Sequence, residues 1–271
     1  MTIPLEDLFE DIVGKAQRGL GLDDEALAEQ AEISKAALQA LKAGRGVAGQ
    51  VPAVARVLQL DPVALQETYA RAWKPAAQAL NGLAQFNTEL LGMTVNAYVA
   101  WDPSAREAVV FDTGVDASVL LRFVEAQHLQ VRRILLTHTH QDHVAVLDEL
   151  VQATHAPVGC PADEPLPKAE PVHEGVRFTV GGLTIRALLT NGHSAGGTTY
   201  VVEGLDAPVA IVGDSLFAGS MGGAPNRYAL ARRNNREKIL TLPDNTVLAP
   251  GHGPLTTVAE EKVHNPFLAG S

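Results

Sequence analysis

Three histidines and an aspartate lie within one short run, Thr137-His138-Thr139-His140-Gln141-Asp142-His143, directly after an apolar segment. Burying so many polar side chains is costly unless a partner compensates them, and a divalent cation is the usual partner of clustered imidazoles and carboxylates. Residues two apart on an extended segment point the same way, so His138 and His140 can face one ion. Asp142 and His143 follow where an amphipathic helix is predicted to begin, so they can turn toward a neighbouring ion. The run therefore predicts a metal site.

Three later segments each end an apolar run with a potential ligand beside glycine. They place His193 after residues 187–192, Asp214 after 209–213 and His252 after 246–251. Glycine permits the tight turns that carry a strand end into a functional loop. We therefore expect these three side chains to join the histidine cluster.

This ordered set of side chains resembles the ligands of the metallo-β-lactamase superfamily. The segments "GHSAGGTTYVV", "GDSLFAGS" and "TVLAPGHGPLTTVAEEKVHNPF" are similar to those of its short glyoxalase II-like hydrolases, from about residue 83 onward. The implied fold is an αββα sandwich, with two mixed sheets face to face and helices outside. The resemblance implies one ion bound by His138, His140 and His193, and a second bound by Asp142, His143 and His252, with Asp214 bridging.

Such a centre would be hydrolytic. Two divalent ions can hold a hydroxide between them, because metal-bound water titrates near about pH 7. We expect Asp142 to orient this nucleophile as well as to bind metal, and the substrate to be a small thioester or related ester, as in glyoxalase II. Zinc is the expected ion, although histidine and aspartate suit iron and manganese as well.

Other functions fit parts of the same pattern. A persulfide dioxygenase would use one iron bound by His138, His193 and Asp214, and a ligand-sensing regulator would join this fold to a DNA-binding domain. Acyl-homoserine lactonases often carry a tyrosine where this chain has Phe217, which disfavours that activity. β-Lactamase activity is disfavoured by Asp214 and by the cytoplasmic character of the chain.

Residues 1–75 are predicted to form helices without strands, and they make up the first of two predicted domains. The stretch "LDDEALAEQAEISKAALQALKAG" resembles the helix-turn-helix of phage-repressor-like DNA-binding domains, which implies a helix over 34–43 in the major groove. That helix offers Lys35, Gln39 and Lys42 to DNA. However, residues 1–75 carry eight Lys and Arg against eleven Asp and Glu, a balance of 8 − 11 = −3. Phosphate neutralisation supplies much of DNA-binding energy, so self-association or coverage of the active site is the favoured role.

The second predicted domain, residues 83–271, alternates strands and helices, so the whole chain is expected to be α+β. Strands are predicted over 94–101, 108–112, 134–137, 177–180 and 183–189, and helices over 119–128 and 143–154. Residues 219–228 depart from the "GD.LF.GS.GR.D" pattern of the short relatives. The side chains in and after this segment that are candidates for binding an anionic substrate group are Arg227, Tyr228, Arg232 and Arg233.

The composition describes an ordinary globular protein of 271 residues, 46% hydrophobic and 19% charged. We expect a cytoplasmic protein, because the sequence contains neither a signal peptide pattern nor a long apolar stretch. A homo-oligomer is also expected. A lone Cys160 excludes an internal disulfide and is predicted to be a buried strand residue. The net charge of −10 argues against general affinity for nucleic acid.

Overall fold

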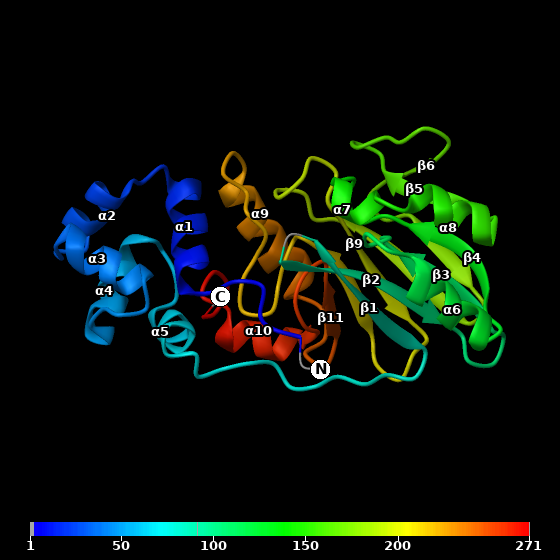
Figure 1. Cartoon of the computed structure of the whole chain (residues 1–271), viewed down its shortest axis with the longest axis horizontal. Helices are drawn as coiled ribbons and strands as arrows, with labels where there is room; N and C mark the ends of the chain where they lie inside the picture. Colours follow the sequence, from blue (N-terminus) through cyan, green and yellow to red (C-terminus); the bar gives the residue numbers. More distant parts are fainter. Residues whose placement is uncertain (1–2, 91, 271) are drawn as a thin grey trace.

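The computed structural model describes residues 3–90 and 92–270. It places a small helical module beside a sandwich of two sheets (Figure 1). The helices of the module are α1 (Phe9–Leu20), α2 (Asp24–Gln30), α3 (Lys35–Lys42), α4 (Val51–Val57) and α5 (Pro62–Ala70), with a 3-10 turn at Ala48–Gln50.

Side-chain caps fix where these helices begin. The side chains of Asp23, Ser34 and Asp61 accept backbone N–H groups in the first turns of α2, α3 and α5. Such caps satisfy donors that have no partner within the helix. The start of each of these helices is therefore stabilised by the side chain of the residue before it.

The strands of the described residues form two six-stranded mixed sheets. The first sheet contains β1 (Leu83–Leu90), β2 (Met93–Trp101), β3 (Glu107–Phe111), β4 (Gln130–Leu135), β5 (Val158–Pro161) and β6 (Glu170–Val172). The second contains β7 (Arg177–Val180), β8 (Leu183–Leu189), β9 (Thr198–Glu203), β10 (Val209–Gly213), β11 (Val247–Pro250) and β12 (Thr256–Thr257). Strand β1 was not predicted from the sequence, whereas the β7–β8 hairpin was predicted and is confirmed.

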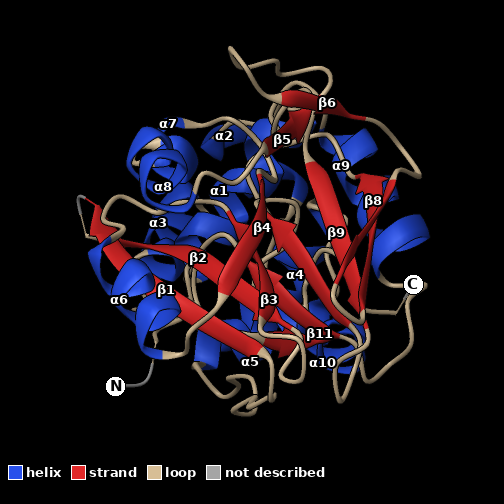
Figure 2. Ribbon diagram, turned by 90° about the vertical axis from the view of Figure 1, so that its right-hand side faces the viewer, coloured by secondary structure: helices blue, strands red, loops and turns tan. Residues whose placement is uncertain are grey.

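Two apolar layers hold the sandwich together. Between the sheets lie large buried residues such as Phe111, Tyr200 and Ile211. On the outer face of the first sheet, α6 (Ser118–Ala126) and α8 (Leu147–Thr154) cover Ile134 and Cys160 (Figure 2). Cys160 is a buried residue of β5, as predicted. The αββα arrangement that the resemblance implied is confirmed.

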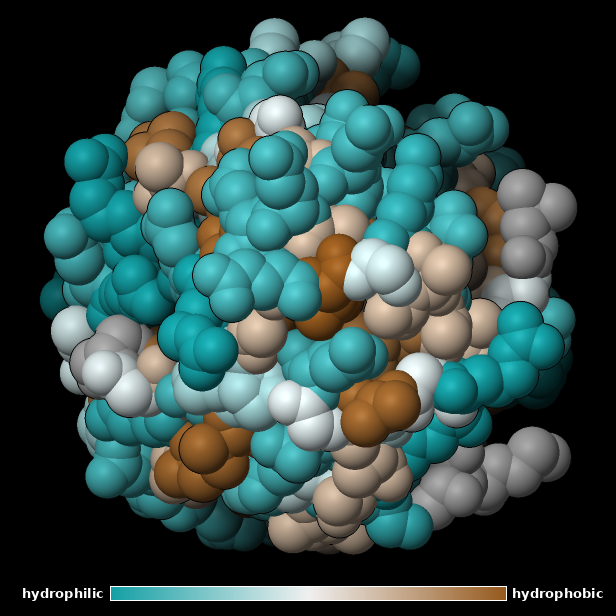
Figure 3. Space-filling model, turned by 90° about the vertical axis from the view of Figure 1, so that its left-hand side faces the viewer, coloured by the Kyte–Doolittle hydropathy of each residue, from teal (hydrophilic) through white to brown (hydrophobic). Residues whose placement is uncertain are grey.

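The helical module shares its core with the second sheet. One buried cluster joins Ile12 and Leu41 of the module to Leu188, Val212 and Phe267 of the sandwich. The helices at this junction are α9 (Tyr228–Asn234), a π-helical segment (Asn235–Ile239) and α10 (Val258–His264). On the opposite face of the module, hydrophilic side chains dominate, with separate hydrophobic patches (Figure 3).

The segment that carries the histidine run ends its strand earlier than predicted. Strand β4 stops at Leu135, because the backbone N–H of Thr137 donates to the Asp112 carboxylate at 2.7 Å instead of to a neighbouring strand. The predicted helix over 143–154 is broken into α7 (Gln141–Val144) and α8. The break follows because the carbonyl of His143 accepts from Thr113 N–H at 2.9 Å, outside the helix.

Across residues 3–90 and 92–270, none of the helices has the length and apolar character that crossing a membrane would require.

We expect Gly19→Ala to destabilise the protein by about 1–2 kcal/mol, measured by chemical denaturation. A Cβ at Gly19 would come within 2.3 Å of Cγ of Tyr228, whose buried ring packs α1 against α9. This clash should exceed the gain of about 1 kcal/mol that alanine brings to a helix interior. Gly14→Ala in the same helix is the control, since its Cβ meets only the mobile end of Arg18. If both substitutions stabilise the protein equally, the close packing of Gly19 against Tyr228 is contradicted.

Candidate metal centre

The predicted ligands meet at one edge of the sandwich, because the strands that carry them end there. Strand β4 leads to the histidine run, and its parallel partner β3 ends at the same edge. In the second sheet, parallel strands β10 and β11 lead to Asp214 and His252. His193 follows β8. Carboxyl ends of parallel strands lie together, so side chains far apart in the sequence converge.

The first group of side chains able to hold a cation is His138, His140 and His193. Nε2 of His193 lies 3.0 Å from Nδ1 of His140. His138 is buried and His140 is exposed, so this part of the centre faces solvent on one side.

The second group is Asp142, His143 and His252. Oδ2 of Asp142 lies 3.5 Å from Nε2 of both His143 and His252. Asp214 lies between the two groups. Its Oδ1 is 3.4 Å from Nε2 of His143, and its Oδ2 is 3.4 Å from Nε2 of His193 and 3.3 Å from Nε2 of His252.

The outer ring nitrogens of His193 and His252 are fixed by backbone carbonyls. Nδ1 of His193 contacts the carbonyl of Gly223 at 3.0 Å, and Nδ1 of His252 contacts that of Thr94 at 2.8 Å. A carbonyl only accepts, so each Nδ1 must carry the proton. When the ring is neutral, each Nε2 therefore presents its lone pair to the centre of the cluster, as a metal ligand requires.

A buried carboxylate fixes His138 and His143 in the same way. Asp112 accepts from Nδ1 of His143 at 3.0 Å and from the Thr137 hydroxyl at 2.7 Å. Because that hydroxyl donates its proton to Asp112, it must accept from Nδ1 of His138, which lies 3.0 Å away. Both Nε2 atoms again face inward.

The inward atoms need a partner that the described protein groups do not supply. Within residues 3–90 and 92–270, Nε2 of His138, Nε2 of His143 and Oδ1 of Asp214 are buried without a hydrogen bond. Leaving such groups unpaired is costly. Five imidazoles and two carboxylates with inward lone pairs match the ligands of zinc, iron or manganese. The residues therefore fit a dinuclear metal centre.

The charges in the cluster favour the ligating protonation states of several groups. Burial lowers the pKa of His138 well below its usual value, and burial likewise lowers that of His193. Burial opposes ionisation of Asp214, but the imidazoles of His252 and His143 hold its pKa well below the usual range. Burial also disfavours protonated His252, yet the Asp214 carboxylate raises its pKa to about 9. A cation would compete with that proton.

Two supporting residues escaped the sequence prediction. Asp112 follows the apolar run of β3 and precedes Thr113-Gly114, the same pattern that marked the ligand segments. Glu164 accepts from the N–H groups of Thr139 and Gly196, at 2.8 and 2.6 Å. Its position 21 residues after the nearest candidate ligand, His143 (164 − 143 = 21), gives no sequence signal for these contacts.

The divergent loop at 219–228 supports the ligands closely. A Cβ at Gly222 would lie 1.9 Å from the Asp214 carbonyl and 2.8 Å from Nδ1 of His193. At Gly251, a Cβ would lie 2.1 Å from Oδ1 of Asp214. No larger residue fits either position without moving a ligand.

The candidate substrate residues fall into two pairs, and in one of them the Arg232 guanidinium lies 5.5 Å from the ring centre of Tyr228. Tyr228 is buried against the helical module, and Arg232 donates to the carbonyls of Gln59 and Phe267 at 2.8 and 3.0 Å. These contacts give both residues a role at the junction. Arg227 and Arg233 are exposed, so they remain free for the predicted contact with an anionic substrate group.

The candidate DNA-binding residues lie on α3. Lys42 pairs with Asp24 and donates to Gln17 at 2.6 Å, while Lys35 lies 3.8 Å from Glu25. Gln39 is exposed. Pairing with acidic neighbours reduces the positive potential that phosphates would meet. DNA binding by this helix, like its helix-turn-helix character, stays a prediction.

The helical module reaches the loop that follows Asp214. Buried Asp7 accepts from the Ser220 hydroxyl and from the Lys15 ammonium. Lys15 also donates to the Met221 carbonyl at 3.0 Å and lies 4.8 Å from the ring centre of Phe217. The Phe217 ring in turn packs edge-on against His252. The module therefore supports the same loop that holds His193.

Known proteins resemble this chain over its sandwich. A family model described as the Metallo-beta-lactamase superfamily matches residues 91–252. The "Probable metallo-hydrolase YqgX" of Bacillus subtilis is 32% identical over 189 residues, covering 60% of this chain and 88% of that protein. The "Hydroxyacylglutathione hydrolase GloC" of Haemophilus influenzae is 29% identical over 210 residues, covering 67% of this chain and 98% of that protein.

A solved structure has the same fold. The crystal structure of BLEG-1, described as a B3 metallo-beta-lactamase, superposes with a TM-score of 0.60 at 32% identity, covering 69% of this chain and all of that one. The matched family region begins at residue 91, after the helical module.

We expect Asp112→Asn to weaken metal binding by about 10–100-fold, measured by competition with a chromogenic chelator. The amide cannot accept from Thr137 N–H, the Thr137 hydroxyl and His143 together, so the imidazoles lose their fixed orientation. Asp116→Asn is the control, because that exposed carboxylate only caps the start of α6. Unchanged affinity in the first variant would refute the orienting role of Asp112.

We expect stability to fall as the pH rises from about 4.5 to 8, through a buried carboxyl beneath the divergent loop. Burial raises the pKa of Glu261 to about 8, although hydrogen bonds from Asn265 and Thr256 act in the opposite direction. The unfolded chain releases this proton near pH 4.5, whereas the folded chain retains it until about pH 8. The stabilisation is therefore complete below pH 4.5 and is lost as the pH rises toward 8. In Glu261→Gln, the melting temperature should fall less steeply as the pH rises across this range, because the contribution of this carboxyl is removed. A slope identical to that of the unaltered chain would contradict the expectation.

Proposed function

The chain belongs to the metallo-beta-lactamase superfamily, and we propose that it is a metal-dependent hydrolase of a small thioester or related ester. The observation that carries the proposal is the pair of ligand groups joined by Asp214, with the Nε2 atoms of four anchored histidines turned inward.

In this proposal, His138, His140 and His193 hold one ion, Asp142, His143 and His252 hold the other, and Asp214 contacts both. Bound divalent ions would supply a nucleophilic water at neutral pH and polarise the carbonyl of the substrate. Zinc is the proposed ion.

The protein's own groups would then position substrate and protons. The side chain of Asp142 is 18% exposed, so it lies where the attacking water would enter. Its carboxylate would orient that water and accept its proton. Exposed His140 marks the open side from which an ester or thioester carbonyl would approach. Burial of His138, His143 and His252 keeps water from the rear of the cluster.

The choice of a thioester rests on relatives. The Haemophilus protein is named a hydroxyacylglutathione hydrolase and is matched over 98% of its length. Its name indicates cleavage of an acyl–sulfur bond, which the same arrangement of ligands would perform here. The similarity to a protein described as a B3 metallo-beta-lactamase makes a β-lactam the necessary comparison substrate.

The test is hydrolysis of a substrate panel by full-length protein of measured metal content. The panel holds a hydroxyacylglutathione, a simple acyl thioester, an oxygen ester and a β-lactam, assayed without oxygen. We expect the thioesters to have the highest kcat/KM. Asp214→Ala should lose bound metal and reduce kcat/KM by about 100-fold or more, since it removes the ligand shared by both groups. Asp206→Ala changes an exposed carboxylate in the bend between β9 and β10 and serves as the control.

Different results would replace the proposal with another activity. In a separate aerobic assay with a persulfide, dioxygen uptake matched to persulfide consumption, with one iron per chain, would make the protein a dioxygenase. Preferred turnover of the β-lactam would make it a β-lactamase. Full activity and metal content in Asp214→Ala would remove the assigned role of that residue.

A further inference from the structure

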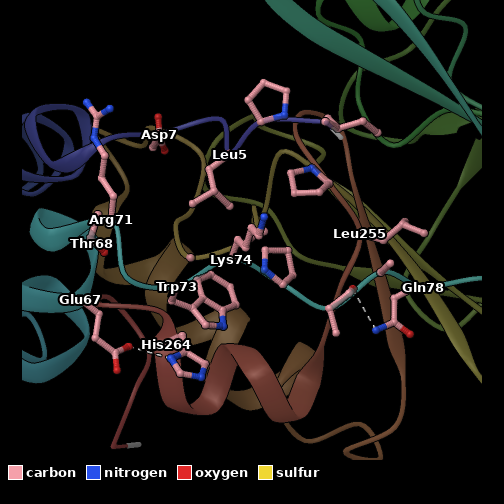
Figure 4. Close-up of a pocket in the computed structure, with 18 of the residues that line it drawn as sticks. Leu5, Asp7, Glu67, Thr68, Arg71, Trp73, Lys74, Gln78, Leu255 and His264 are labelled. Carbon is pink, nitrogen blue, oxygen red and sulfur yellow. Dashed lines mark hydrogen bonds and ion pairs between the residues drawn. The ribbon is translucent and has the colours of Figure 1, made fainter. Parts of the chain in front are cut away.

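A second cavity lies at the junction of the helical module and the sandwich, and its volume is about 790 Å³. Its walls come from the N-terminal segment 3–8, the connecting segment 71–78, and residues next to the ligand-bearing loops, such as Leu255 (Figure 4). Small-molecule sites usually occupy about 300–1,000 Å³. The cavity therefore has the size of a ligand site.

The connecting segment is held as a wall of this cavity. The Trp73 ring stacks on His264 of α10, with ring centres 4.7 Å apart and planes 13° apart. Nδ1 of His264 contacts the Glu67 carboxylate at 2.7 Å. The N–H of Ala76 donates to Glu260 at 2.8 Å. These contacts anchor the segment at two places, so the cavity is formed before any ligand arrives.

The lining is mainly apolar. Ile3, Leu5, Trp73, Pro75 and Leu255 contribute hydrocarbon or aromatic surface. Figure 4 shows Trp73 and Lys74 in the middle of the drawn residues, with Leu5 and Leu255 on two sides of them. An apolar group of a ligand would gain free energy by leaving water here.

The lining carries two carboxylates and two cations with long side chains, and the two carboxylates already have partners. Asp7 is already paired with Lys15 and Ser220, and Glu67 with His264. By contrast, the ammonium of Lys74 and the guanidinium of Arg71 make no hydrogen bond or ion pair with any group in the described part of the chain. Two unpaired cations beside an apolar surface complement an amphipathic anion.

The cavity is separated from the metal centre by one layer of backbone. A Cβ at Gly253, next to His252, would lie 3.2 Å from the N atom of Glu6 and 3.5 Å from the Pro4 carbonyl. The Gln85 side chain donates to the Gly253 carbonyl at 3.1 Å. On the cavity side of this backbone layer, the lining includes Leu5, Asp7 and Pro254. None of the candidate metal ligands lines the cavity.

We propose that this cavity is a second ligand site, which binds a small amphipathic carboxylate independently of the metal centre. The apolar acyl or aryl group lies against Trp73, Leu5 and Leu255. The carboxylate meets Lys74, with Arg71 at the entrance. This site is distinct from the hydrolytic centre, so its occupancy does not depend on the proposed function.

The experiment is isothermal titration calorimetry of the full-length, metal-loaded protein with decanoate. We expect saturable binding of one decanoate per chain. Decanol, which has the same hydrocarbon length without the charge, should bind at least about 10-fold more weakly. Lys74→Met should weaken decanoate binding by a similar factor, because it keeps the apolar stem and removes the charge. Lys168→Met makes the same change at an exposed lysine outside the cavity and should bind decanoate normally.

Two further measurements separate this site from the metal centre. Removing metal with a chelator should leave decanoate affinity within about twofold, provided that melting shows a folded protein. Ala77→Trp, which introduces an indole at the lining, should abolish binding while metal content stays unchanged. Binding that is lost with the metal, or that is normal in both Lys74→Met and Ala77→Trp, would overturn the proposal. Neither result would bear on thioester hydrolysis, which is assayed separately.

Discussion

The metal centre depends on how each histidine is held at the nitrogen that faces away from it. An imidazole presents a ligating lone pair only when its other nitrogen keeps the proton. Here that proton is fixed by the carbonyls of Gly223 and Thr94, by Asp112, and by the Thr137 hydroxyl that Asp112 itself orients. Three of these acceptors lie in or directly after strands of the first sheet, and the fourth belongs to the divergent loop. The sandwich therefore acts on the chemistry by fixing tautomers and ring directions, as well as by bringing the ligands together.

The same dependence explains why the loop after Asp214 is tightly packed. Its glycine at 222 lies against Asp214 and His193, and the next carbonyl holds the His193 ring. From the other side, Asp7 and Lys15 of the helical module bind the loop at Ser220 and Met221. A core that joins the module to the second sheet keeps these contacts in place. The helical module thus helps to hold the loop that supports the metal centre.

Sequence reasoning succeeded where a local pattern carries the physics. Apolar runs that end in a candidate ligand beside glycine correctly predicted that His193, Asp214 and His252 lie together. It failed where a long-range hydrogen bond overrides the local pattern. Thr137 leaves β4 because Asp112 captures its N–H, and the helix after His143 breaks because Thr113 captures its carbonyl. Tyr228 and Arg232 looked like substrate residues by composition, but contacts with the helical module engage both.

The sequence by itself indicated the kind of chemistry, since seven histidine and aspartate side chains in this order are typical ligands of metal ions. It also determined the αββα fold through its resemblance to a known family. Only the tertiary structure decided which nitrogen of each histidine faces the centre, that Asp112 and Glu164 support it, and that a separate cavity lies beneath the N-terminal segment. These features arise from contacts between residues tens to hundreds of positions apart. Hydrogen-bond partners at such separations leave no periodicity or spacing in the chain, so they exist only once the backbone has folded.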